Sequence, residues 1–318
     1  MSRTRFALAS LGLLVLVIDV AYGQNYPAKP IRIVTGAAGG GGDFASRLVV
    51  QAISGPLGQP VIVDNRSGSL LAAEAVSKAP PDGYTLTVQG AVLWILPLLY
   101  KAPYDAVRDF APISLMLREV SVLAVHPSLP AKSVKELIAL AKAKPGELSY
   151  SSSQVGGQSH LAMELFKSMA GADIVHIPYK GAGAATIGLL SGQVQLMINS
   201  APPMMPHVKA GKLRALAVTS AEPSLLVPGL PTVAATGLPG YESVSMTCIL
   251  APAKTPAAVI NRLNQEIVRA LNQPDIKSRF LSAGAETVGS SPEELAATIK
   301  ADQARMDKII KDAGIKGE

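Results

Sequence analysis

The 318-residue sequence has one cysteine, few aromatic residues and few charged residues. Cys248 has no partner in the chain, which excludes an internal disulfide, and we expect it to be buried as a small hydrophobic residue. Only 16% of residues are charged, and no run of Lys or Arg is present, which argues against nucleic-acid binding. The 48% of hydrophobic residues indicates a globular protein long enough for two domains.

Long apolar runs are also lacking, and this excludes a membrane-spanning helix after the N-terminal segment. That segment has the parts of a signal peptide: Arg3 and Arg5, then an apolar run at 6–18, then a small residue at Gly23. The run is about 13 residues long, short of the ~20 that cross a bilayer. No cysteine follows it, so a lipoprotein anchor is excluded. We expect export with cleavage near Gly23; an uncleaved anchor is the alternative.

From Ile31 onward, short β-branched runs alternate with helical patterns, which indicates parallel βαβ units. Proline-bounded turns at 127–130 and 252–256 both follow predicted strands, and we interpret them as two crossings of the chain between domains. The sequence predicts an α/β fold of two domains, each a mostly parallel sheet flanked by helices. Domain one comprises 24–120 and 246–318, domain two comprises 121–245, and 1–23 is the signal peptide.

Several predicted elements matter for the site. They are strands at 31–35, 122–125 and 246–250, helices at 44–53, 182–190 and 257–271, a helix at 133–142 capped by Ser133, and a loop at 90–96. Ligands in open α/β sheets lie beyond the carboxyl ends of the strands. The loops that follow the strands are therefore the candidates for a binding cleft between the two domains.

A glycine-rich loop directly follows the first strand. Its candidate ligand-binding residues are Gly36, Ala37, Ala38, Gly40, Gly41, Gly42 and Asp43. Glycines let backbone N–H groups converge on an anion at a helix N-terminus, and we expect Gly41 to need positive φ and Asp43 to be the N-cap. The loop also fits a dinucleotide-binding pattern with Asp64 as the ribose ligand, but it is too long and the protein is exported, so we disfavour a dehydrogenase.

A second loop is rich in hydroxyl and amide side chains, and its candidates are Ser152, Ser153, Gln154, Ser159 and His160. These groups suit a carboxylate. Serine and histidine also raise the possibility of a hydrolase, but no nucleophile-elbow motif is present. The four histidines are widely spaced and fit no metal-ligand pattern, so we predict neither a metal nor a cofactor.

A third loop supplies Tyr179, Lys180, Gly181 and Ala182. Lys180 is either a partner for a carboxylate or a solvated surface lysine. The only tryptophan, Trp94, lies in the predicted loop 90–96. It either borders the cleft or packs in the core of domain one, because apolar residues surround it. None of the three loops supplies a nucleophile with its base, so the pattern indicates binding without turnover.

Many segments together resemble one known family. They are 26–32, the glycine loop, 57–61, 64–66, 81–86, 104–110, 176–181, 211–217 and 231–233. In this order they are similar to the Bug family, the solute receptors of tripartite tricarboxylate transporters. The resemblance covers the mature chain. It implies a periplasmic type II binding-protein (Venus-flytrap) fold, carboxylate ligands held by the three loops, and delivery to membrane permease subunits; it adds Asn199 as a candidate.

The sequence departs from the family pattern around the pocket. Residues 35–38 replace a proline- and aromatic-containing segment, Gly42 replaces a threonine, and Leu96 replaces an asparagine. The loop at 67–71, which begins at the candidate Ser67, is shorter by about two residues than the resemblance implies. These departures predict a roomier, more apolar pocket, suited to an aromatic or longer-chain acid. Relaxed selection on an orphan receptor is the alternative.

The sequence therefore predicts a periplasmic solute-binding protein, monomeric, that captures a small organic acid for a tripartite tricarboxylate transporter. A periplasmic sensor that presents the bound acid to a signalling partner is the alternative, because it would use the same fold and cleft. We expect no enzymatic activity.

Overall fold

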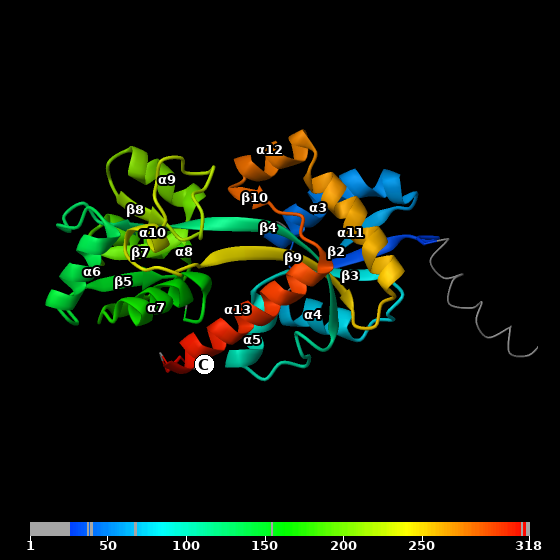
Figure 1. Ribbon diagram of the computed structural model, residues 1–318, viewed down its shortest axis with the longest axis horizontal. Helices are drawn as coiled ribbons and strands as arrows, with labels where there is room; N and C mark the ends of the chain where they lie inside the picture. The colour runs from blue at the N-terminus through cyan, green and yellow to red at the C-terminus, as the bar shows by residue number, and fades with distance from the viewer. Residues whose placement is uncertain are drawn as a thin grey trace, which may run out of the picture.

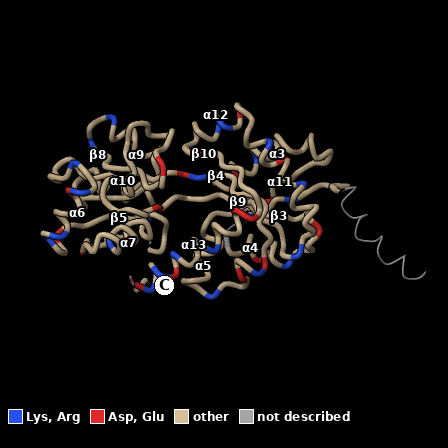
Figure 2. The backbone as a smooth tube through the Cα atoms, in the orientation of Figure 1, with Lys and Arg blue, Asp and Glu red and all other residues tan. Residues whose placement is uncertain are grey.

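The computed structural model describes residues 26–36, 38, 41–66, 69–153, 155–312 and 314–315. The predicted signal peptide lies outside these residues. Two lobes lie side by side, and the strands β4 (Phe110–Val125) and β9 (Val244–Pro252) run between them (Figure 1). Acidic and basic residues are interspersed over both lobes rather than gathered on one face (Figure 2).

The first lobe is built from both ends of the chain. Its N-terminal elements are β1 (Ile31–Thr35), α3 (Gly41–Leu57), β2 (Val61–Asn65), α4 (Ser69–Ser77), β3 (Thr85–Gly90) and α5 (Val92–Leu99). Its C-terminal elements are α11 (Ala257–Leu271), α12 (Pro274–Ser282), β10 (Ala285–Thr287) and α13 (Pro292–Asp312). β1 pairs in parallel with β2 and β3. The apolar stripe of α11, which includes Val259, Leu263 and Ile267, packs with α3 over one face of this sheet.

The second lobe holds the middle of the chain. Its elements are α6 (Val134–Ala143), β5 (Ser149–Ser152), α7 (Gln158–Ala170), β6 (Val175–Pro178), α8 (Ala182–Leu190), β7 (Leu196–Ser200), α9 (Ala201–Lys209), β8 (Arg214–Val218) and α10 (Val233–Thr236). β5 pairs in parallel with β6 and β7. Ser133 caps α6 as predicted, because its side chain accepts a hydrogen bond from Glu136 N at 3.2 Å.

The connecting strands are longer than predicted. β4 has 16 residues and pairs antiparallel with β9, β10, β7 and β8, so the sheet runs on from one lobe to the other in the order β2-β1-β3-β9-β4-β7-β5-β6. Its first part escaped prediction because irregularities at Pro112–Ser114 and Leu115–Leu117 disturb the alternation of side chains. The α/β class is confirmed, with parallel pairs in the outer strands and antiparallel pairs at the connection.

Separate hydrophobic clusters lie on both faces of the sheet in each lobe. α13 contributes to both lobes: Leu295 and Ile299 pack in the first, whereas Met306 and Ile309 pack against α7 in the second. The domain boundaries inferred from the sequence stay a prediction. Cys248 is fully buried, as expected, and burial raises the pKa of its thiol. Among the described helices, none combines the length and apolarity needed to cross a membrane.

Candidate functional site

The glycine loop connects β1 to α3 at the carboxyl edge of the first-lobe sheet. α3 begins at Gly41, so Asp43 lies inside its first turn, and the prediction that Asp43 is the N-cap was wrong. Gly41 is itself the first residue of α3, and helical residues have negative φ, so the expectation of positive φ was also wrong. Gly42 has a different reason to be glycine: a Cβ there would lie 2.6 Å from Thr35 Oγ1, which itself donates to Val88 O.

Asn65, the last residue of β2, anchors this loop. Its Nδ2 donates to Gly36 O at 3.0 Å and to Asp43 Oδ1 at 2.9 Å, while its Oδ1 accepts from Arg47 Nη2 at 3.0 Å. Arg47 also pairs with the buried Asp43 carboxylate at 2.9 Å. One amide therefore joins the end of β1 to the first turn of α3. The candidates Ala37, Gly40 and Ser67 lie outside the described residues, and Ala38 is exposed.

The serine loop connects β5 to α7 in the second lobe. Ser159 Oγ accepts from Ser153 N at 3.1 Å, and the two serine hydroxyls lie 3.2 Å apart. Gly156 has φ 71° and donates its N–H to His160 Nδ1 at 2.9 Å. The first residues of α7 thus hold the loop that precedes them. The candidate Gln154 lies outside the described residues.

A stack of rings lies behind the serine loop. The His160 and His176 rings stack at 4.0 Å, and Tyr150 stacks on His176 at 4.8 Å. Burial lowers the pKa of both imidazoles, and the neighbouring His160 lowers that of His176 further, to about 4. His176 Nε2 lies 2.7 Å from Ser152 Oγ, but Ser152 has no exposed surface and so cannot reach a substrate. This serine–histidine contact is a packing contact.

The third loop lies beside the serine loop. Gly181, with φ 100°, donates to Ser153 O at 2.9 Å, and α8 begins at Ala182. Lys180 is exposed. The Tyr179 ring lies over Gly188 of α8, where a Cβ would approach its hydroxyl to 2.3 Å, and it donates to Gln193 Oε1. Asn199 is buried at the end of β7, with its Nδ2 3.5 Å from Thr186 Oγ1 in α8.

Loops from both lobes reach the same stretch of β4. A Cβ on Gly41 would lie 4.0 Å from Glu119 Oε1, and Gln158 Nε2 lies 3.4 Å from Ser121 Oγ. Residues two apart on a strand share a face and lie about 7 Å apart. The starts of α3 and of α7 therefore lie near neighbouring residues of β4, where this strand passes between the lobes. Burial raises the pKa of the Glu119 carboxyl.

A cavity of about 350 Å³ lies between the lobes on the α13 side. Gly90, Ala91 and Val92 from the start of α5 form one wall, and Gly156, Gly157 and Gln158 from the start of α7 form the opposite wall. Neither helix has a side-chain hydrogen bond at its N-cap. The first N–H groups of a helix have no intrahelical acceptor and carry its positive pole. Two such poles, one from each lobe, face this cavity.

The region 90–96 is not the predicted loop, because α5 begins at Val92. Trp94 is fully buried in the first-lobe core rather than on the cavity wall, so the core interpretation is the one that the structure supports. Its Nε1 donates to Asp302 Oδ2 of α13 at 2.7 Å. Asp302 also pairs with Arg305, which donates to Glu242 O. This network fixes α13 across both lobes.

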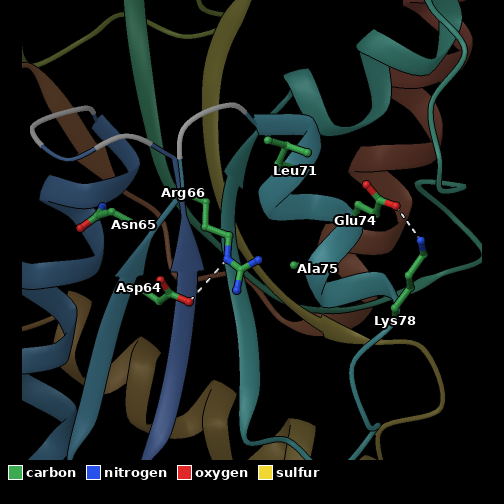
Figure 3. A pocket seen from close by; sticks show the side chains of 7 residues that line it. All are labelled: Asp64, Asn65, Arg66, Leu71, Glu74, Ala75 and Lys78. Carbon is green, nitrogen blue, oxygen red and sulfur yellow. Dashed lines mark hydrogen bonds and ion pairs between the residues drawn. The ribbon is translucent and has the colours of Figure 1, made fainter.

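A second hollow, of about 660 Å³, lies at the outer edge of the first-lobe sheet (Figure 3). Its charged groups are already paired: Arg66 lies 3.5 Å from Asp64, and Lys78 lies 2.5 Å from Glu74. In Figure 3 the Asn65 side chain lies on the other side of β2 from Arg66, towards α3. The hollow is away from the interlobe cleft, so we do not consider it the ligand site.

Comparison with known proteins identifies the family. A family profile described as "Tripartite tricarboxylate transporter family receptor" matches residues 45–315. The chain belongs to this family. It is 34% identical to protein BugT of Bordetella pertussis, over 99% of both chains. The resemblance to Bug proteins is thereby confirmed, and the chain is a solute-binding receptor, not an enzyme.

Solved structures of similar proteins agree with this family assignment. An R. palustris protein with adipate is 36% identical, covers 92% of this chain and 100% of its own, and has a TM-score of 0.73. The periplasmic binding protein BugD is 30% identical with a TM-score of 0.69, over 92% of this chain and 100% of its own. The family members are periplasmic receptors. In the part of the chain that the structure describes, no group of His, Cys, Asp or Glu is arranged to hold a metal ion.

Several residues around the interlobe cavity carry no sequence signal of their own. Asn65 was noticed only as part of a family segment, and Ala91, Gln158 and Glu119 were not selected. The uncapped starts of α5 and α7 were the available signal, because Ala91 and Gly157 have no capping side chain. That signal required knowing where each helix begins.

Proposed function

We propose that this receptor binds a small organic acid in the interlobe cavity, in the periplasm, and delivers it as a monomer to the permease subunits of a tripartite tricarboxylate transporter. The observation that carries the proposal is the convergence of the α5 and α7 N-termini on one cavity. The glycine loop, the serine loop and the third loop complete the proposed binding surface around the same cleft.

A carboxylate suits this geometry for an electrostatic reason. Each helix N-terminus stabilises a negative charge by about 0.3–1 kcal/mol when exposed and up to ~2 kcal/mol when partly buried. A carboxylate between the two would accept hydrogen bonds from both lobes, so its binding would favour the closed arrangement. The relative of this chain that was solved with adipate supports an acid as the ligand class.

A thermal-shift screen of mono- and dicarboxylates tests binding. An acid at about 100 times its Kd adds roughly 2.7 kcal/mol to the free energy of unfolding, which raises Tm by several degrees for a chain of this size. If no acid in a broad panel raises Tm and native mass spectrometry finds no co-purified acid, the proposed ligand class is wrong.

The substitution Gln158→Asp tests whether the acid binds at the start of α7. It places a carboxylate at the first position of α7, where it stabilises the helix but occupies the anion position. Two like charges about 5 Å apart repel by roughly 3 kcal/mol at an effective dielectric constant of ~20, so we expect about 100-fold weaker binding by calorimetry. Gln158→Asn, the neutral control, should bind within a few-fold of wild type. Equal affinities of the two variants would move the site elsewhere.

Delivery requires a test in cells. Deletion of the gene should abolish uptake of the labelled acid that the purified receptor binds. Wild-type protein should restore uptake, and Gln158→Asp should not. Uptake that persists without the gene would contradict a transport role and leave the binding result intact.

A further inference from the structure

We infer that the ligand carries a single carboxylate and an apolar body, such as a linear or aromatic monocarboxylate, rather than two carboxylates. The inference rests on the proposed function and deepens it. It comes from what lines the interlobe cavity beyond the two helix N-termini.

The remaining cavity wall is mostly apolar. Val92, Ile95 and Leu96 of α5, Leu161 of α7 and Met306 of α13 line it. A volume of about 350 Å³ lies in the range of small-ligand pockets, ~300–1,000 Å³. A hydrocarbon chain or ring that extends from the helix N-termini would therefore contact side chains rather than water. Each methylene buried there should tighten binding about fourfold.

The charged groups of the wall are turned to protein partners rather than to the cavity. Arg305 Nε has no hydrogen-bond partner among the described residues, but it is buried and so is not exposed to a ligand. Among the described residues that line the cavity, only Asp302 and Arg305 are charged, and they form an ion pair with each other. Trp94 Nε1 also holds Asp302 in place. A second carboxylate would lose its hydration beside the negative charge of Asp302, because Asp302 and Glu242 O already hold the Arg305 guanidinium.

Arg118 is a second arginine beside the ion pair, but it lies in a separate cavity. That cavity, of about 270 Å³, shares Val244, Asp302 and Arg305 with the first, so the ion pair forms part of the boundary between them. Arg118 Nε is buried with no hydrogen-bond partner among the described residues, but the acidic Glu242 lines the same space. A diacid would have to extend past Asp302 to reach it.

Matched acids test the inference by calorimetry on the wild-type receptor. Hexanoate and adipate have six carbons and differ in one end group; benzoate and terephthalate share a ring. We expect the monoacid of at least one pair to bind tighter by on the order of tenfold or more, and neither diacid to be preferred. If either diacid binds tighter than its matched monoacid, the inference is overturned, but the proposed function is not. Binding of neither monoacids nor diacids would overturn the proposed function and this inference with it.

A charge-introducing variant provides the second test. Leu96 is partly exposed, so Leu96→Lys can place an ammonium at the apolar wall without burying it fully. We expect it to raise the affinity for adipate relative to hexanoate at least tenfold over wild type, whereas Leu96→Met keeps the wild-type preference. An unchanged preference in Leu96→Lys would overturn the inference. So would wild-type adipate binding that Arg118→Leu abolishes, because the second carboxylate would then lie beside Arg118.

Discussion

The first lobe fixes its glycine loop through one side chain from a neighbouring strand, whereas the second lobe fixes its serine loop through side chains of the loop and of α7. Asn65, at the end of β2, donates hydrogen bonds to Gly36 O and to Asp43 Oδ1, which are 29 and 22 residues earlier in the chain. Ser159 and His160 instead bond to backbone N–H groups four to six residues earlier. The supports of the two loops thus differ in range and in chemistry.

The difference has a physical consequence for how each loop responds to change. Among the described residues, the Asn65 amide makes side-chain hydrogen bonds to both ends of the glycine loop, so a single substitution removes several contacts at once. The support of the serine loop is distributed over hydroxyls and stacked rings, and two of those rings can take up protons. We therefore expect a single substitution to destabilise the first loop. A change of pH should instead affect the second loop.

Asn65→Ala should have the largest effect on stability. It removes three hydrogen bonds, one of them to a buried carboxylate, and we expect a loss of about 2 kcal/mol. Tm should fall by roughly 4 °C or more, with weaker ligand binding as the glycine loop loosens. The matched control is Asp64→Ala, because the ion pairs of Asp64 are partly exposed and worth roughly 0–1 kcal/mol. Equal losses in the two variants would show that Asn65 does not anchor the loop.

The stacked histidines should give the second lobe a pH dependence. An unfolded histidine has a pKa of ~6.5, and the pKa of His176 in the fold is about 4. Between these values the unfolded chain binds a proton that the folded chain does not. Stability should therefore decrease as pH falls from about 6.5 to about 4 and be fully present above that window.

His176→Asn isolates this contribution. Tm measured between pH 6.5 and 4 should fall less steeply in His176→Asn than in wild type, because the buried imidazole no longer titrates. Asn65→Ala retains the histidines and should keep the wild-type slope at a lower Tm. A wild-type slope in His176→Asn would mean that carboxyl groups, not the ring stack, cause the acid sensitivity.

Local patterns predicted the elements whose side chains repeat regularly. β1, α8 and α11 have the bounds expected from the sequence, Ile31–Thr35, Ala182–Leu190 and Ala257–Leu271. α5 was missed because it is apolar on both sides: Leu93 and Trp94 face the core, while Val92 and others face the cavity. Such a helix has no polar face to reveal its period.

The positions of the three candidate loops in the fold were predictable from the sequence, whereas the side chains that hold them were not. The three loops follow strands, and their positions could be read from turn-forming residues and strand order. The role of Asn65 depends on a partner 29 residues away, and that of Asp302 on Trp94, 208 residues away. No local pattern encodes contacts of that range. The crossing of α13 from one lobe to the other is likewise set by tertiary packing.

The smallest effect concerns Trp94, which lies behind the first-lobe wall of the cavity. Its indole has no exposed surface, so ligand binding should leave its emission maximum unchanged while Tm rises. Ile95→Trp in a Trp94→Phe background moves the only indole to the cavity wall, where an apolar ligand body would displace water from it. That variant should show a saturable shift with the same midpoint as calorimetry. If ligand shifts the emission maximum of the wild type, or leaves that of the variant unchanged, then α5 turns a different face to the ligand than the one described.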